Sequence, residues 1–316
     1  MSKRSFVFAS LLLLAGCLEV ESLEVRAVAD AKNDRLDLMI VSRGVSSSAT
    51  SADGVAKDLA NLRRCRDVAA IPWPGLGVID VTRPSVDEQK GRDADEEKWM
   101  RFVPFFDIEA GAFFTDEQGR LCFYQFVRIH RPKEFAAQCS RLLLAAWLAE
   151  RKVSPATRAL LEQAAKEERP VVTIDGAGIC VRRPLSEEDH RVERATFWRN
   201  VARSATPPAK SEARASSEPI ASAMQVMRDN DFAMVRRRDV TEYVVGEQGS
   251  DACDYRMPGE KYKDNLMIAF SADEPRPPTV TQALIDKQFA AFHEREARLP
   301  PAFVEMKKRA LPPTGR

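Results

Sequence analysis

The chain has 316 residues, of which 44% are apolar and 30% charged, and its formal net charge is +1. This is the composition of a globular protein with a substantial core rather than that of a disordered chain. Acidic and basic residues are interspersed without a basic block or face, which argues against a nucleic-acid-binding protein.

The first 17 residues have the order of an export signal. Lys3 and Arg4 precede an apolar run, Ser5–Leu14, which is about half the length that a membrane-spanning helix needs. The run ends in Leu-Ala-Gly-Cys at residues 14–17. This tetrapeptide resembles the lipobox of bacterial lipoproteins, and the resemblance covers residues 1–17 only. The alternative is an ordinary secretory signal cut elsewhere, with Cys17 incidental.

The resemblance implies that Cys17 is a lipidation site. A diacylglyceryl group would be attached to its sulfur, the chain would be cut after Gly16, and the new α-amine would be acylated. Two or three acyl chains hold a protein stably on a membrane where one would be marginal. Leu18, rather than Asp, follows Cys17, and in enteric-type bacteria this favours the periplasmic side of the outer membrane. The inner membrane and the cell surface are the alternatives, and other envelope proteins are expected partners.

Residues 18–130 predict mainly β-structure. Alternating apolar and polar residues predict strands at 18–29 and 35–45, joined by a turn, with a bulge or register shift near Ser22. A helix is expected at 55–68, a turn-rich connector around Trp73 and a short strand after it. The clearest unit is a hairpin within 102–130, rich in Phe, Ile, Val and Tyr, whose turn contains Gly119.

The rest of the chain predicts helices, a second hairpin and a linker. The predicted elements, in chain order, are helices from Pro132 and from Pro155, a small hairpin at 169–183, a helix that Ser186 and Asp189 open as a capping box, an Ala/Ser/Pro-rich linker or loop at 202–219, strands at 231–246 and 261–272, a helix at 280–296, and a Pro-rich tail.

These elements predict an α+β fold, with antiparallel β-hairpins or a sheet packed against several α-helices. The expected organisation is a signal at 1–16, an α+β domain at 17–201, the linker at 202–219 and a smaller α+β region at 220–316. That last region either forms a second unit or packs as part of the first domain.

Four residues of the 102–130 hairpin are candidates for acid–base chemistry. Asp107 and Glu109 share one face of the first strand, and Arg128 and His130 of the second strand come near them in one register. The alternative, which the pattern favours, is a half-solvated sheet face with cross-strand ion pairs, because the other face supplies the core.

Two further groups have a chemical and a structural interpretation. Glu187, His190 and Glu193 follow one another at i, i+3 spacing, which is half of a di-metal carboxylate pattern. No second copy exists, so a solvated helix face is favoured. The four tryptophans would either line a groove that binds a sugar or, as the pattern favours, pack separately in the core. They are Trp73, Trp99, Trp147 and Trp198.

The cysteines predict neither a zinc site nor a redox motif, because none of them form a CxxC pair. Five remain after Cys17, so an oxidising compartment would leave at least one free thiol, and spacing does not choose the pairs: Cys65, Cys122, Cys139, Cys180 and Cys253. A reactive cysteine nucleophile is the less favoured alternative to buried structural thiols.

No catalytic or cofactor motif emerges from the sequence. Phosphate-binding glycine loops, HExxH and EF-hand spacings are lacking, and three histidines are few for a metal site. We therefore predict no cofactor. The favoured function is a non-catalytic binding, scaffolding or assembly module of the envelope. The alternatives are an envelope hydrolase that uses carboxylates as acid and base, and a small-molecule or lipid carrier.

Overall fold

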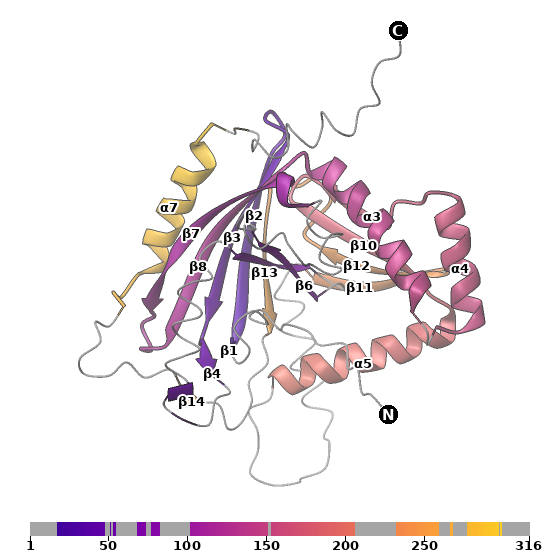
Figure 1. Ribbon diagram of the computed structural model, residues 1–316, viewed down its shortest axis with the longest axis horizontal. Helices are drawn as coiled ribbons and strands as arrows, with labels where there is room; N and C mark the ends of the chain where they lie inside the picture. The colour runs from indigo at the N-terminus through magenta and orange to yellow at the C-terminus, as the bar shows by residue number, and fades with distance from the viewer. Residues whose placement is uncertain are drawn as a thin grey trace.

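The computed structural model describes residues 18–47, 51, 53–54, 68–73, 77–82, 102–150, 153–205, 232–258, 266–267, 277–296 and 298. Within these ranges the chain forms antiparallel sheets with packed helices, which confirms the predicted α+β class (Figure 1). The helix expected at 55–68, apart from Val68, and the C-terminal tail lie outside the described residues.

The larger sheet has five antiparallel strands. In spatial order they are β13 (Ala252–Pro258), β2 (Ser22–Asp30), β3 (Arg35–Arg43), β8 (Leu121–His130) and β7 (Phe106–Thr115). A short 3₁₀ turn, Val103–Phe105, leads into β7. Eight of the nine residues of β3 are buried. The central strand therefore has core on both of its faces.

The β7–β8 hairpin is where the sequence placed it, and its turn follows from local chemistry. The Asp116 carboxylate accepts the backbone N–H groups of Gln118 (3.1 Å) and Arg120 (2.9 Å), while Gly119 has a φ of 75°. A bulge interrupts the pairing between Ala110 and Phe113. It contains Gly111, where a Cβ would lie 1.9 Å from the carbonyl oxygen of Tyr124, so only glycine fits this approach.

The smaller sheet has four antiparallel strands: β11 (Phe232–Arg237), β12 (Val240–Val245), β10 (Gly178–Pro184) and β9 (Val172–Asp175). The helices near it in Figure 1 are α3 (Pro132–Ala149), α4 (Pro155–Lys166) and α5 (Glu187–Ala205). Each begins where the sequence predicts a helix. Because α5 continues to Ala205, the first four residues of the predicted linker are helical; residues 206–219 lie outside the described part.

Two short pairings complete the strands. The irregularity predicted near Ser22 is a break: β1 (Leu18–Glu19) pairs with β4 (Ser46–Ser47), and β4 also pairs with β14 (Leu266–Met267). A two-stranded ribbon joins β5 (Val68–Trp73) to β6 (Gly77–Thr82). The strand after Trp73 was predicted. However, β5 occupies residues assigned to the end of a helix and to a connector, because its partner strand stabilises it.

Segments beyond residue 220 are built into both sheets. Strand β12 pairs with β10, and β13 pairs with β2. One apolar cluster joins the two sheets and α3, with members that include Leu38, Val127, Phe135, Val181 and Tyr243. A second cluster lies on the opposite face of the large sheet, under α7 (Gln282–Glu294). In the described ranges, the chain from either side of the predicted linker therefore shares one core.

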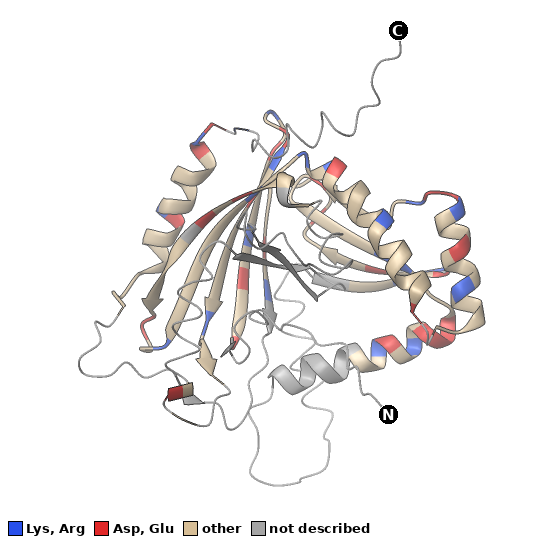
Figure 2. Ribbon diagram, in the orientation of Figure 1, with Lys and Arg blue, Asp and Glu red and all other residues tan. Residues whose placement is uncertain are grey.

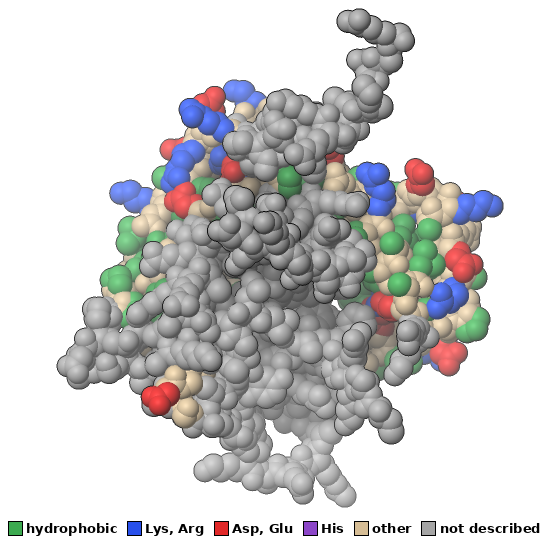
Figure 3. Space-filling model, viewed as in Figure 1, with side chains coloured by type: hydrophobic (Ala, Val, Ile, Leu, Met, Phe, Trp, Pro, Cys, Tyr) green, Lys and Arg blue, Asp and Glu red, His purple; other side chains and the backbone are tan. Residues whose placement is uncertain are grey.

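Acidic and basic residues are interspersed along α4 and the described part of α5 (Figure 2). On the face seen in Figure 3, blue and red side chains alternate with hydrophobic ones on both flanks. The described part of this face carries no extended patch of a single sign, which agrees with the interspersed charges of the sequence.

Candidate functional site

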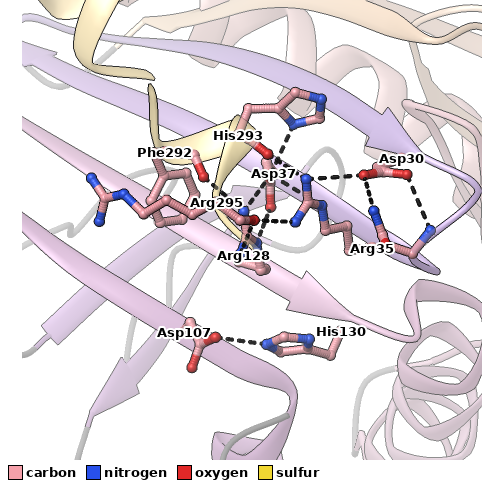
Figure 4. Close-up of polar contacts among 10 residues, drawn as sticks. Asp30, Arg35, Asp37, Asp107, Arg128, His130, Phe292, His293 and Arg295 are labelled. Carbon is pink, nitrogen blue, oxygen red and sulfur yellow. Dashed lines mark hydrogen bonds and ion pairs between the residues drawn. The ribbon is translucent and has the colours of Figure 1, made fainter. Parts of the chain in front are cut away.

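The predicted acid–base residues lie on the face of the large sheet that α7 covers. Asp37 of β3, Arg128 of β8 and Asp107 of β7 are direct partners in the antiparallel register and form one row across three strands. The C-terminal end of α7 lies over this row (Figure 4). Asp37 was not among the predicted residues, although it lies on a predicted strand.

The carboxylate of Asp37 is fully buried and has three cationic or imidazole neighbours. It accepts two hydrogen bonds from Arg128, from Nε at 2.8 Å and from Nη2 at 3.0 Å. His293 Nδ1 lies 2.9 Å from Oδ2, and Arg35 Nε lies 3.6 Å from the same oxygen. Such a two-pronged arginine–carboxylate pair is the strongest common form of ion pair.

Both buried arginines of this group also bind the end of α7. Arg128 Nη2 donates to the carbonyl of Phe292 at 2.8 Å, and Arg35 Nη1 donates to that of Arg295 at 2.7 Å. Arg35 also donates to the carbonyl of His293. The last carbonyls of a helix lack partners within the helix and carry partial negative charge, so two guanidinium groups stabilise them. We call Arg35, Asp37, Arg128 and His293 the Asp37 cluster.

The remaining predicted residues of the hairpin also have polar partners. His130 Nε2 lies 2.8 Å from Asp107 Oδ2, and Glu109 pairs with Arg295. The predicted cross-strand pairing is therefore present between β7 and β8. The predicted half-solvated face holds on β7, where the side chains of Asp107 and Glu109 are 32% and 38% exposed. It is wrong on β8, where Arg128 and His130 are only 3% and 2% exposed. The reason is α7, which comes from a distant part of the chain and covers this surface.

This arrangement offers little to acid–base chemistry. A general acid or base must reach a substrate proton, yet both oxygens of Asp37 already accept hydrogen bonds. The His130 ring bonds Asp107 directly. Among the described residues, no hydroxyl or thiol is hydrogen-bonded to this ring as a nucleophile would be. The observed contacts join neighbouring strands of the sheet to one another and the sheet to α7.

The predicted face of Glu187, His190 and Glu193 on α5 does not exist as one surface. Two steps of three residues rotate a side chain by about 120° around a helix, so the first and last members diverge. Glu187 pairs with Arg191 at the surface. His190 is 6% exposed, with Nδ1 at 2.6 Å from Thr241 Oγ1, and its burial lowers its pKa. The prediction of a solvated face is wrong for His190.

Glu193 belongs to a second buried polar group, which sequence reasoning missed. Arg183 bonds Glu150 at 2.7 Å and Glu193 at 3.2 Å, and its guanidinium lies 5.4 Å from the centre of the Trp147 ring. Tyr243 donates to Glu193. Burial raises the pKa of Glu150, and Arg183 partly offsets this rise. A single arginine of β10 thus contacts side chains at the end of α3 and on α5. The sequence signal for this group was an arginine near the end of a predicted apolar strand.

The structure describes the side chain of one of the four tryptophans, Trp147. Trp147 is 4% exposed and belongs to the main core cluster, which confirms its favoured interpretation. The side chains of Trp73 and Trp198, and the whole of Trp99, lie outside the described residues.

The described cysteines are buried: Cys122, Cys139, Cys180 and Cys253. Burial raises the pKa of the first three, so their thiols stay protonated at neutral pH. A nucleophilic cysteine needs the opposite shift. Cys65 and Cys17 lie outside the described residues, so lipidation at Cys17 stays a prediction.

Neither a metal site, nor a membrane-spanning helix, nor a similar known protein identifies the described part of the chain. In the described ranges, no group of three or more His, Cys, Asp or Glu side chains is arranged to hold a metal ion. No helix among those residues is long and apolar enough to cross a membrane. Comparison of the chain with protein-family models, with curated proteins and with solved structures found no match.

Proposed function

We propose that this chain is a lipid-anchored protein of the bacterial cell envelope, and that its folded part is a non-catalytic binding, scaffolding or assembly module. The anchor is supported by the lipobox-like tetrapeptide at residues 14–17. One observation carries the non-catalytic part. The carboxylates and histidines expected to do acid–base work already have polar partners within the fold: Asp107 bonds His130 on the neighbouring strand, Glu109 pairs with Arg295 after α7, and His190 of α5 bonds Thr241 of β12.

The two alternatives have less support. A hydrolase acting through the 102–130 hairpin would need an available acid and base, whereas Asp107 and Glu109 are paired with His130 and Arg295. A carrier would need an apolar cavity along the aromatic hairpin. Instead, Phe126 packs within 5.6 Å of Phe289 and 5.5 Å of Phe292, ring centre to ring centre.

The anchor is tested by replacing the lipid acceptor. Cys17→Ser should accumulate as unprocessed precursor and incorporate no labelled fatty acid, because the sulfur that receives the diacylglyceryl group is gone. Cys180→Ala is the matched control and should be processed and labelled like the wild type. Normal maturation of Cys17→Ser would refute lipidation at this residue.

The module is tested by activity and by capture. Purified mature protein incubated with peptidoglycan should release no soluble fragments; release that Asp107→Asn abolishes would favour the hydrolase. Crosslinked protein purified from membranes should carry a reproducible envelope protein at a stoichiometric level. Recovery of a bare monomer with a small molecule or lipid bound would contradict the scaffold and favour the carrier.

A further inference from the structure

We infer that the end of the molecule that contains β1, β4 and the β7–β8 turn lies against the lipid headgroups, and that the Asp37 cluster faces away from the bilayer. This inference rests on the proposed lipidation of Cys17. It adds an orientation, which the lipobox alone does not give.

The tether between Cys17 and the first fixed residue of the fold is short. Leu18 directly follows the proposed lipidated residue, and its backbone pairs with Ser47 in the β1–β4 ladder. One peptide unit spans only 3.8 Å. If β1 separated from β4, the chain would still be fixed at Val20, which is 2% exposed, and at Glu21, whose N–H donates to the carbonyl of Arg43 at 2.9 Å. The tether would then reach about 10 Å at most.

The β7–β8 turn lies next to the point where the tether is fixed. The N–H of Val45, two residues before Ser47, donates to the carbonyl of Leu121 at 2.8 Å. Leu121 is the first residue after the β7–β8 turn, and Arg120 of that turn bonds Glu21 at 3.1 Å. In Figure 1 the short strands and this turn lie at the same end of the large sheet. A short tether therefore brings the turn to the membrane surface.

The Asp37 cluster lies at the opposite end of the large sheet from the tether. Strand β3 runs for nine residues from Arg35 to Arg43, which corresponds to about 26 Å. Helix α7 runs alongside: Gln282 at its start bonds Arg43 at 2.6 Å, and the carbonyl of Arg295 beyond its end bonds Arg35 at 2.7 Å. The Asp37 cluster and the exposed β2–β3 turn around Lys32 are thus at the far end.

The orientation has a consequence for partners. Groups at the far end of β3 and α7 face the aqueous compartment, where a soluble or membrane-embedded partner of the opposite membrane would approach. The near end is available only to lipid and to neighbours in the same bilayer.

The test compares two exposed positions on the lipidated full-length protein. A fluorescent amino acid replaces Glu117 in the β7–β8 turn or Lys32 in the β2–β3 turn, both exposed. Each protein is reconstituted into phosphatidylethanolamine–phosphatidylglycerol vesicles that contain a lipid with a nitroxide on its headgroup. Quenching at position 117 should exceed that at position 32 several-fold. An insertion of about ten Gly/Ser residues after Cys17 should abolish the difference, because a flexible tether no longer fixes the domain.

Mass spectrometry of the N-terminal peptide separates the two ways in which the inference can fail. An unacylated Cys17 overturns the proposed anchor and the orientation with it. An acylated Cys17 with equal quenching at both positions, or with stronger quenching at Lys32, overturns the orientation alone. Acylation with strong quenching only at Glu117 supports both.

Discussion

Asp37→Asn should be strongly destabilising although Asn has nearly the same shape. The substitution removes the carboxylate that pairs with Arg128, which is 3% exposed. Arg35, 4% exposed, loses only a 3.6 Å contact and keeps its pair with Asp30 at 2.9 Å, so Arg128 is the charge left without a partner carboxylate. Breaking a buried ion pair by neutralising one partner costs about 3–5 kcal/mol, because the other charge stays buried without compensation. The Asn amide also presents an N–H₂ group where the carboxylate accepted two bonds from Arg128.

The measurement is urea unfolding at neutral pH. With an m-value of about 3 kcal/mol/M for a chain of this size, the midpoint of Asp37→Asn should fall by roughly 1–1.7 M. Asp254→Asn is the matched control, because its pair with Arg26 is largely exposed and should contribute at most about 1 kcal/mol. The double variant Asp37→Asn with Arg128→Met should recover part of the loss, since it removes the uncompensated charge as well.

A second readout follows from the contacts with α7. Amide hydrogen exchange at Phe292–Arg295 should accelerate in Asp37→Asn, because the arginines that bind these carbonyls are no longer held by the carboxylate. The reasoning would be refuted if Asp37→Asn shifted the urea midpoint no more than Asp254→Asn, or if exchange in α7 were unchanged.

Three further substitutions test the core and the titrating groups. Phe126→Ala, at a ring that is 2% exposed and packs against α7, should lower the free energy of unfolding by about 3–5 kcal/mol; in the same urea assay, Leu284→Ala, at a side chain 44% exposed, should change it little. Burial raises the pKa of the Cys139 thiol in the folded protein. The unfolded chain therefore loses this proton first, and the free energy of unfolding falls as pH rises above the unfolded pKa of about 8.5. Cys139→Ala should therefore flatten the alkaline part of the stability–pH curve, and a parallel fall in both proteins would contradict this. For Asp189, burial opposes ionisation, but hydrogen bonds from Ser154 and other hydroxyls outweigh it and lower the pKa. The stabilisation from the ionised Asp189 carboxylate is complete above its unfolded pKa of about 3.9 and declines as pH falls below it. Asp189→Asn should therefore destabilise the protein more at pH 7 than at acidic pH, and an equal loss at both would contradict this.

The elements that the sequence predicted well carry their own local signals. The β7–β8 turn is determined by Asp116 and Gly119, and α3 and α4 begin at prolines with the geometry that a first helical turn prefers. Ser186 caps α5 as expected, accepting the N–H of Asp189 at 3.2 Å. In each case the residues that decide the structure are within a few positions of one another.

The polar residues were misjudged because their environment is not local. Alternation along β8 indicates that Arg128 and His130 share a face, but it does not reveal what covers that face. The covering carbonyl of Phe292 is 164 residues further along the chain. Polarity at these positions looked like solvent exposure, whereas Arg128 binds the end of a helix and His130 bonds Asp107 of the neighbouring strand. The same holds for His190, which an isolated helix would present to water.

The buried charges of this fold mark the places where distant segments join. Asp37 and Arg128 meet the end of α7, and Arg183 meets Glu150 and Glu193 from two helices. Replacing such groups by apolar residues is often neutral or even stabilising, so stability alone does not explain their presence. An apolar surface would let α7 dock in several registers, whereas two arginines aimed at the last carbonyls accept only one. We infer that the Asp37 cluster fixes the position of α7 on the sheet. A fixed position of α7 would give the proposed binding module one defined surface at the far end of β3, which an apolar contact of similar stability would not.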